Sequence, residues 1–205
     1  MSQKRTLQGY RSIDLTLFAV ILAAFEYLVC HAALRLFPSQ PFTVSVTPVI
    51  TAIVLMRWGP WAAVHAVLGG LVYSAAAGGG PKQILIYCLG SLFSLGALGL
   101  KKALGAEEIR QHTGKSLLFG LCVVLLMQLG RALISLVLGV EAAAAGLFFT
   151  ADVITDLFTL TVIWIVRRLD GVFEDQKHYL RRLDEEERKE KEDTDEGSSS
   201  GFPDP

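Results

Sequence analysis

The 205-residue sequence contains few charged residues and few cysteines. Charged side chains make up 19% of the chain, hydrophobic side chains make up 52%, and the mean hydropathy is +0.44. This composition is too apolar for a soluble protein of this length and indicates a membrane protein. Cys30, Cys88 and Cys122 each lie in an apolar run without C-x-x-C or His-rich spacing, so we expect small buried side chains, not a disulfide framework or a metal site.

Concentrated basic charge and catalytic motifs are also missing. Residues 1–166 carry 11 Lys/Arg and 7 Asp/Glu, whereas residues 167–205 carry 8 and 13. The basic residues before the tail are scattered between apolar runs, which argues against a nucleic-acid partner. Gly114, Lys115 and Ser116 resemble the end of a phosphate-binding loop, but position 109, where the first glycine should be, is Ile, and no strand precedes it. Neither a zinc-protease motif nor a nucleophile elbow occurs. We therefore expect neither enzymatic activity nor a cofactor.

Six apolar stretches approach the length needed to cross a membrane. They cover about 13–36, 42–56, 59–78, 83–100, 116–138 and 145–166. The first is too long for the core of an export signal and is interrupted by Glu26, so we expect a retained spanning helix. The second is short and contains Pro41, Thr43, Ser45 and Pro48. We expect it to be broken near the membrane surface or to lie partly within protein.

Basic residues are distributed unevenly between the two sides of this arrangement. With six crossings, ten basic residues fall on one side: Lys4, Arg5, Arg11, Arg57, Lys101, Lys102, Arg110, Lys115, Arg167 and Arg168. Arg35 and Lys82 fall on the other, so the positive-inside rule places both termini in the cytoplasm. The predicted fold is an all-α integral membrane bundle of six transmembrane helices over 1–168. A charged cytoplasmic helix and a flexible tail follow over 169–205.

Four ionisable residues lie inside the expected spans: Glu26, Arg131, Asp152 and Asp156. A charge at this depth is costly unless it faces a partner or water. Asp152 and Asp156 are spaced i, i+4, and Gln128 and Arg131 share a face of the fifth span, so Arg131 can reach one or both carboxylates. Two interpretations remain open, an internal ion pair that joins spans five and six and a polar pocket that opens outward.

Small residues mark two helix surfaces. Ala62, Ala66, Gly70, Ser74 and Gly78 recur at every fourth position of the third span, which is typical of close internal packing. Ala19 and Ala23 form a shorter smooth patch of the same kind in the first span. His65, in the middle of the third span, has no second His or Cys nearby and is expected to be a hydrogen-bonded packing group.

Four sequence stretches resemble a known family, the substrate-binding S components of energy-coupling-factor (ECF) transporters. They are AVILA at 19–23, TPVITAI at 47–53, RWGP at 57–60 and AVLGG at 66–70. The resemblance covers about 10–168. It implies a six-helix protein of a bacterial inner membrane that captures a vitamin or related micronutrient and works with a transmembrane coupling subunit and two ATPase subunits.

The resemblance also implies roles for particular residues. Ala19 and Ala23 would dock against the coupling subunit. The substrate pocket would lie in the outer half and would draw on 38–44 and on the residues Glu26, Lys82, Gln83, Tyr87, Gln128, Arg131, Asp152 and Asp156. Capture at the outer face would be followed by toppling of the whole protein in the membrane. Arg131 and Lys82 are compatible with an anionic or zwitterionic substrate, and Tyr87 could stack on a ring.

Two other functions are compatible with the same sequence. In a membrane scaffold of similar fold, like the cell-shape proteins, Arg131, Asp152 and Asp156 would only brace the bundle. In a stand-alone proton-linked carrier, Glu26 and Asp156 would be the proton sites. Inverted repeats would favour the carrier, and the sequence has none that we can recognise.

Overall fold

The computed structural model describes residues 7–38 and 42–199, and within these ranges the protein is all-helical. The α-helices are α1 (Leu7–Leu36), α2 (Thr47–Trp58), α3 (Ala62–Ala76), α4 (Pro81–Ser91), α5 (Ala97–Leu104), α6 (Ala106–Gln111), α7 (Thr113–Val137), α8 (Ala142–Ala151), α9 (Val153–Val166) and α10 (Gln176–Ser199). Two 3₁₀ turns, η1 (Gly59–Trp61) and η2 (Leu92–Gly96), join α2 to α3 and α4 to α5.

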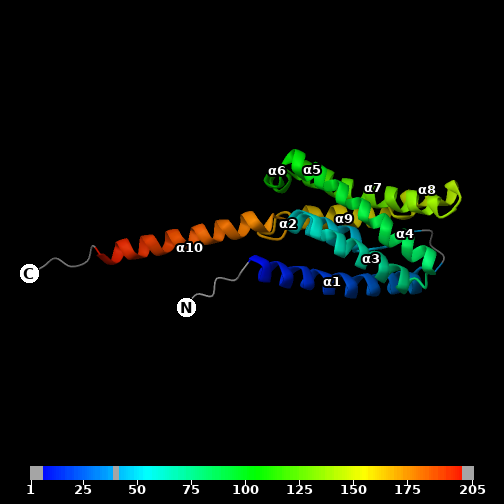
Figure 1. Ribbon diagram of the computed structural model, residues 1–205, viewed down its shortest axis with the longest axis horizontal. Coiled ribbons are helices and arrows are strands. Elements are labelled where there is room, and N and C mark those ends of the chain that lie inside the picture. Colours follow the sequence, from blue (N-terminus) through cyan, green and yellow to red (C-terminus); the bar gives the residue numbers. More distant parts are fainter. Residues whose placement is uncertain (1–6, 39–41, 200–205) are drawn as a thin grey trace, which may run out of the picture.

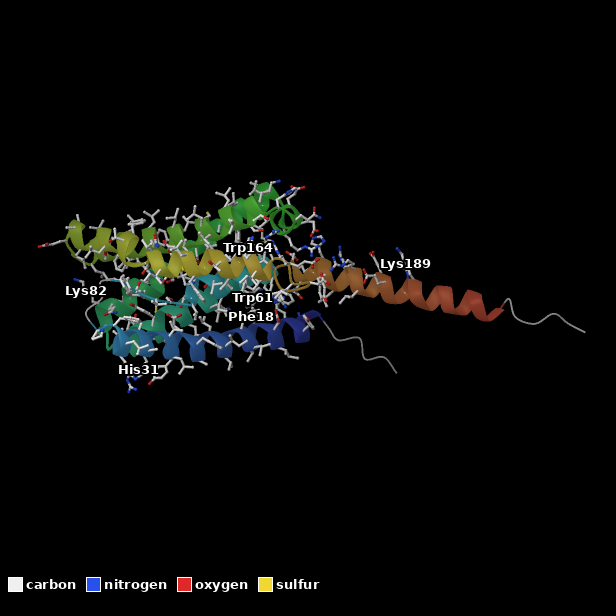
Figure 2. The ribbon with its side chains drawn as sticks, turned by 180° about the vertical axis from the view of Figure 1, so that it is seen from behind. Phe18, His31, Trp61, Lys82, Trp164 and Lys189 are labelled. Carbon is white, nitrogen blue, oxygen red and sulfur yellow. The ribbon has the colours of Figure 1, made fainter. Side chains whose placement is uncertain are left out.

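Helices α1 to α9 form an elongated bundle from which α10 projects as a single helix (Figure 1). We call the end where α1 begins and α10 departs the α10 end, and the opposite one the far end. Trp61 and Trp164 lie toward the α10 end, whereas His31 and Lys82 lie at the far end (Figure 2). Eight of the ten basic residues predicted to share one side belong to the described residues. They lie toward the α10 end, opposite Arg35 and Lys82.

Five segments of the described chain are long and apolar enough to cross a membrane. They are Gln8–Leu36, Thr47–Ala76, Pro81–Leu104, Thr113–Val137 and Ala142–Val166. Many large apolar side chains point outward, for example Leu17, Phe25 and Leu28 on α1, each more than half exposed. Apolar segments of spanning length with an apolar outer surface are compatible with a multi-pass membrane protein.

The second of these segments is folded back on itself. The two ends of α2 contact α1 in reverse order, because Arg57 pairs with Asp14 while Thr47 binds Glu26. Helix α3 runs in the same direction as α1, since His65 contacts the Leu15 carbonyl and Cys30 contacts the Tyr73 carbonyl. The reversal occurs at Gly59, whose φ of 60° is a conformation that favours glycine. At 12 residues, α2 is only about 18 Å long.

The stretch 42–46 leads into α2 and confirms that the second apolar run is irregular; we call it the extended 42–46 stretch because 42–45 have neither helix nor turn. It lies beside a second interruption, at Asp152, where α8 ends and α9 begins. The Thr43 amide donates to the Ala151 carbonyl at 2.8 Å, and the Ser45 amide donates to the Thr155 hydroxyl at 3.1 Å. The segment predicted over 145–166 is present as Ala142–Val166, but its helix is interrupted at Asp152. The two irregular stretches satisfy one another's backbone groups, which an apolar environment requires.

Glycines bring helix backbones into close contact in the core. A Cβ at Gly70 would lie 2.6 Å from the Tyr87 carbonyl oxygen of α4, so the predicted small-residue ridge of α3 is an internal packing surface. A Cβ at Gly90 of α4 would lie 2.6 Å from the Arg131 backbone of α7. This second crossing has no regular spacing in the sequence and was not predicted. His65 is fully buried and its Nε2 lies 3.0 Å from the Leu15 carbonyl oxygen, as expected of a packing group.

The start of α10 is tied to the bundle by buried polar contacts. The Arg57 guanidinium binds Asp14 at 2.8 Å and donates to the carbonyls of Gly171 and Val172. Lys101 binds Asp175 at 2.9 Å and donates to the Met56 carbonyl at 2.7 Å. The connection between α9 and α10 is therefore anchored against the C-terminal end of α2.

Candidate functional site

Arg131 and Asp152 form a buried ion pair in the half of the bundle toward the far end. Arg131 Nη1 lies 2.9 Å from Asp152 Oδ2, and the two side chains are 3% and 4% exposed. The guanidinium also donates to Ser91 Oγ at 3.3 Å and lies over the Tyr87 ring, 4.7 Å from its centroid. The other carboxylate oxygen of Asp152 accepts from the Thr43 hydroxyl. The pair therefore joins α4 and α7 to the α8–α9 junction and to the extended 42–46 stretch.

Asp156 does not share this pair. Gln128 Nε2 donates to both oxygens of Asp156, at 2.8 and 2.9 Å. Asp152 and Asp156 remain one helical turn apart, since the Asp156 amide donates to the Asp152 carbonyl at 2.9 Å, and each carboxylate has its own partner on α7. Both contacts cross between α7 and the α8–α9 pair, which are the neighbours that the sequence predicted.

Glu26 binds the start of α2 from α1. Its Oε2 accepts from the amides of Val46 and Thr47 at 2.8 and 2.9 Å and from the Thr47 hydroxyl at 2.9 Å. The N-terminus of a helix carries unsatisfied amides and a partial positive charge, so a carboxylate is stabilised there. The side chain is fully buried, and among the described residues its second oxygen, Oε1, has no hydrogen-bond partner.

A small cavity opens at the far end, between the last turns of α1, the 42–44 stretch and α3. Its volume is about 80 Å³. The lining residues are Cys30, Ala33, Leu34, Phe37, Pro38, Phe42, Thr43, Val44 and Tyr73. Thr43 connects the cavity to Asp152, and Tyr73 connects it to Arg131, because the Tyr73 and Tyr87 rings are in contact with centroids 4.7 Å apart.

None of the eight residues predicted singly to bind substrate lines this cavity, whereas part of the predicted segment 38–44 does. Tyr87, Asp152, Arg131 and Glu26 are buried behind the lining residues. Lys82 is exposed at the far end (Figure 2), and Gln83 is half-buried near Gly79. Within the predicted segment 38–44, Pro38 and 42–44 line the cavity, and 39–41 lie outside the described residues.

Phe42 lies in the segment predicted to supply the pocket, but the other two aromatic residues of the cavity wall, Phe37 and Tyr73, were missed by sequence reasoning. Phe37, Phe42 and Tyr73 come from the end of α1, from the extended stretch and from α3. In the sequence each is an ordinary apolar residue of a span or its flank, and no motif joins them. The only available signal was the irregular second span, which predicted that this part of the chain enters the bundle.

The predicted docking residues, Ala19 and Ala23, line a second and larger hollow. This groove lies between α1 and α3 and has a volume of about 520 Å³. Most of its lining side chains are apolar, and Trp61 of η1 with Val64 and Leu68 of α3 form the side opposite α1. Because alanine side chains are short, the backbone of α1 remains accessible along the groove.

Comparisons with known proteins do not identify the chain. No protein-family model matches the sequence, and no match was found among curated proteins or solved structures.

Proposed function

We propose that this protein is the substrate-capture component of an ECF-type importer in a bacterial inner membrane. In this proposal the chain crosses the membrane six times, with the 42–46 stretch and α2 together forming the second crossing. The α10 end faces the cytoplasm, and the cavity at the far end opens outward. A vitamin or related micronutrient binds there and is delivered with a coupling subunit and two ATPase subunits. The resemblance of the four stretches between 19 and 70 to S components motivates this assignment.

The observation that carries the proposal is the position of the alanine patch. Ala19 and Ala23 line an apolar groove on the outer surface between α1 and α3, and this groove is separate from the cavity at the far end. A smooth groove on a membrane-facing surface suits the close approach of a second helix. Two separate hollows, one for a small molecule and one for a helix, are what a capture component needs.

Docking is tested by filling the groove. Ala23→Trp places an indole in the space that a partner helix would occupy, so we expect loss of co-purification with the coupling and ATPase subunits. Leu17→Trp is the matched control, because Leu17 is 55% exposed on α1 and does not line the groove. Normal co-purification of Ala23→Trp would refute the docking role.

Orientation is tested with two engineered cysteines. An impermeant thiol reagent should label Glu141→Cys, at the start of α8 near the far end, in intact cells. Ser199→Cys, at the end of α10, should be labelled only after the membrane is opened, because the basic α10 end is expected to face the cytoplasm. Labelling of Ser199→Cys in intact cells would contradict the proposed topology.

A scaffold of similar fold is the second candidate, and one observation favours it. Arg131 and Asp152 are almost completely buried and bind one another, as a bracing pair would. Mass spectrometry of small molecules retained by the purified protein distinguishes the two functions. A capture component retains a specific compound, and a scaffold retains none.

A further inference from the structure

The chemistry of the cavity walls indicates which class of molecule it accepts. Phe37, Phe42 and Tyr73 contribute aromatic rings from three separate parts of the chain, and the lining residues include no Lys or Arg. Arg35, the nearest basic residue on α1, is exposed and does not line the cavity. Aromatic faces carry partial negative charge and attract cations, which is how aromatic cages recognise organic ammonium groups.

Buried charge behind the cavity walls also favours a cationic ligand. Glu26 lies one helical turn before Cys30, on the same face of α1 that lines the cavity, and its Oε1 is buried without a partner. Asp152 lies behind Thr43, but its charge is balanced by Arg131. Of these three groups, Glu26 is the one without an oppositely charged partner among the described residues, and its carboxylate is held by the amides and the hydroxyl at the start of α2. A buried charge is weakly screened, so it acts across the cavity wall.

We propose that the cavity binds an organic cation that carries an apolar or aromatic group, an inference that rests on the proposed capture function. The apolar group lies against Phe42 and Tyr73 near the mouth, and the cationic group points inward toward Glu26. The cavity volume of about 80 Å³ is smaller than the roughly 150 Å³ that encloses a benzene ring, so part of the ligand projects through the mouth. The anionic or zwitterionic substrate suggested by Arg131 and Lys82 is not favoured, because Arg131 is already paired and Lys82 is exposed.

Three probes of similar size and different charge test the proposal: benzylammonium, benzyl alcohol and benzoate. Their affinities for the full chain in lipid nanodiscs can be compared by calorimetry. We expect benzylammonium to bind about tenfold more tightly than benzyl alcohol, and benzoate to bind most weakly. If benzyl alcohol or benzoate binds more tightly, the cation assignment is overturned and the capture function stands. If no probe binds and no compound is retained on purification, both fail.

Variants locate the effect within the structure. Glu26→Gln keeps acceptor atoms for the α2 amides and removes the charge, so it should abolish most of the tenfold preference while leaving the affinity for benzyl alcohol unchanged. Glu141→Gln removes an exposed charge near the far end and should leave the preference as it was. Ala33→Phe fills the cavity and should abolish binding of benzylammonium and benzyl alcohol alike. If Glu26→Gln does not fold, the probe series on the unmodified protein still tests the preference for a cation, and Ala33→Phe still tests the location of the site. Unchanged probe binding by Ala33→Phe would overturn the assignment of the cavity as the binding site.

Discussion

The Arg131–Asp152 pair predicts a large coupling between two substitutions, because each partner is almost completely buried. Arg131→Gln leaves the Asp152 carboxylate with only the Thr43 hydroxyl as a donor. Asp152→Asn leaves the guanidinium with Ser91 and the Tyr87 ring. Removing one partner of a buried pair costs about 3–5 kcal/mol, since the remaining charge is uncompensated. We expect each single variant to lower the free energy of unfolding by about this amount.

The double variant removes both charges and should cost less than the sum of the single changes. A neutral Gln and Asn can form hydrogen bonds without burying an uncompensated charge, so we expect a coupling free energy of at least about 2 kcal/mol. Unfolding can be followed by the fluorescence of the three tryptophans during titration with SDS. Arg35→Gln, at an exposed position, is the control for removing a positive charge.

The size and additivity of these losses separate the two interpretations of the pair. Water reaches the pair if each single variant lowers the free energy of unfolding by less than about 1 kcal/mol and the double variant lowers it by the sum of the two losses. The pair would then belong to the wall of a wet pocket, and the bracing role inferred from its burial would be refuted.

Three further changes test other contacts. Gly130→Ala places a methyl group against the Gly90 carbonyl oxygen and the Phe93 side chain and should destabilise by about 1–3 kcal/mol, whereas Gly99→Ala, which has open space, should not. Arg57→Gln leaves the part-buried Asp14 carboxylate with the Trp58 indole N–H as a donor and should cost about 1–3 kcal/mol, measured in the same titration. Arg110 lowers the pKa of Glu107 below its usual value of about 4.5, so this contact stabilises above that pH and is lost as the pH falls through the lowered pKa. Because Glu107 is 53% exposed, the loss should be at most about 1 kcal/mol and absent in Glu107→Gln.

Hydropathy and spacing predicted most of the bundle, because they report which segments prefer lipid. The irregular second run was also predicted, since Pro41 and Pro48 with intervening hydroxyl residues disfavour a helix that faces lipid. The interruption at Asp152 was not predicted. Neither Gly nor Pro marks the position in the sequence, and the Ala151 carbonyl beside it accepts from the Thr43 amide, 108 residues away along the chain. The close crossing of Gly90 and Gly130 escaped prediction for a related reason, because it joins single glycines on two different helices.

The candidate sites were predictable to different degrees. Arg131 and Asp152 could be paired from depth alone, since a buried charge needs a partner, and the structure confirms the contact. The groove lined by Ala19 and Ala23 depends on how α1 packs against α3. The spacing of residues within one helix does not determine this packing. The aromatic cavity required Phe37, Phe42 and Tyr73 to be brought together by the tertiary fold.

The hydrogen bonds of the extended 42–46 stretch constrain the order in which the protein assembles. The Thr43 and Ser45 amides find their partners at Ala151 and Thr155, in a part of the chain synthesised more than 100 residues later. Until then these backbone groups have no partner in an apolar environment, so they remain at the membrane surface or bound to water. Contacts of such long sequence separation form slowly. In the proposed six-crossing arrangement, the second crossing would complete its insertion only after the last one has entered the membrane, and a nascent chain that ends before Ala151 would lack the partners of these amides.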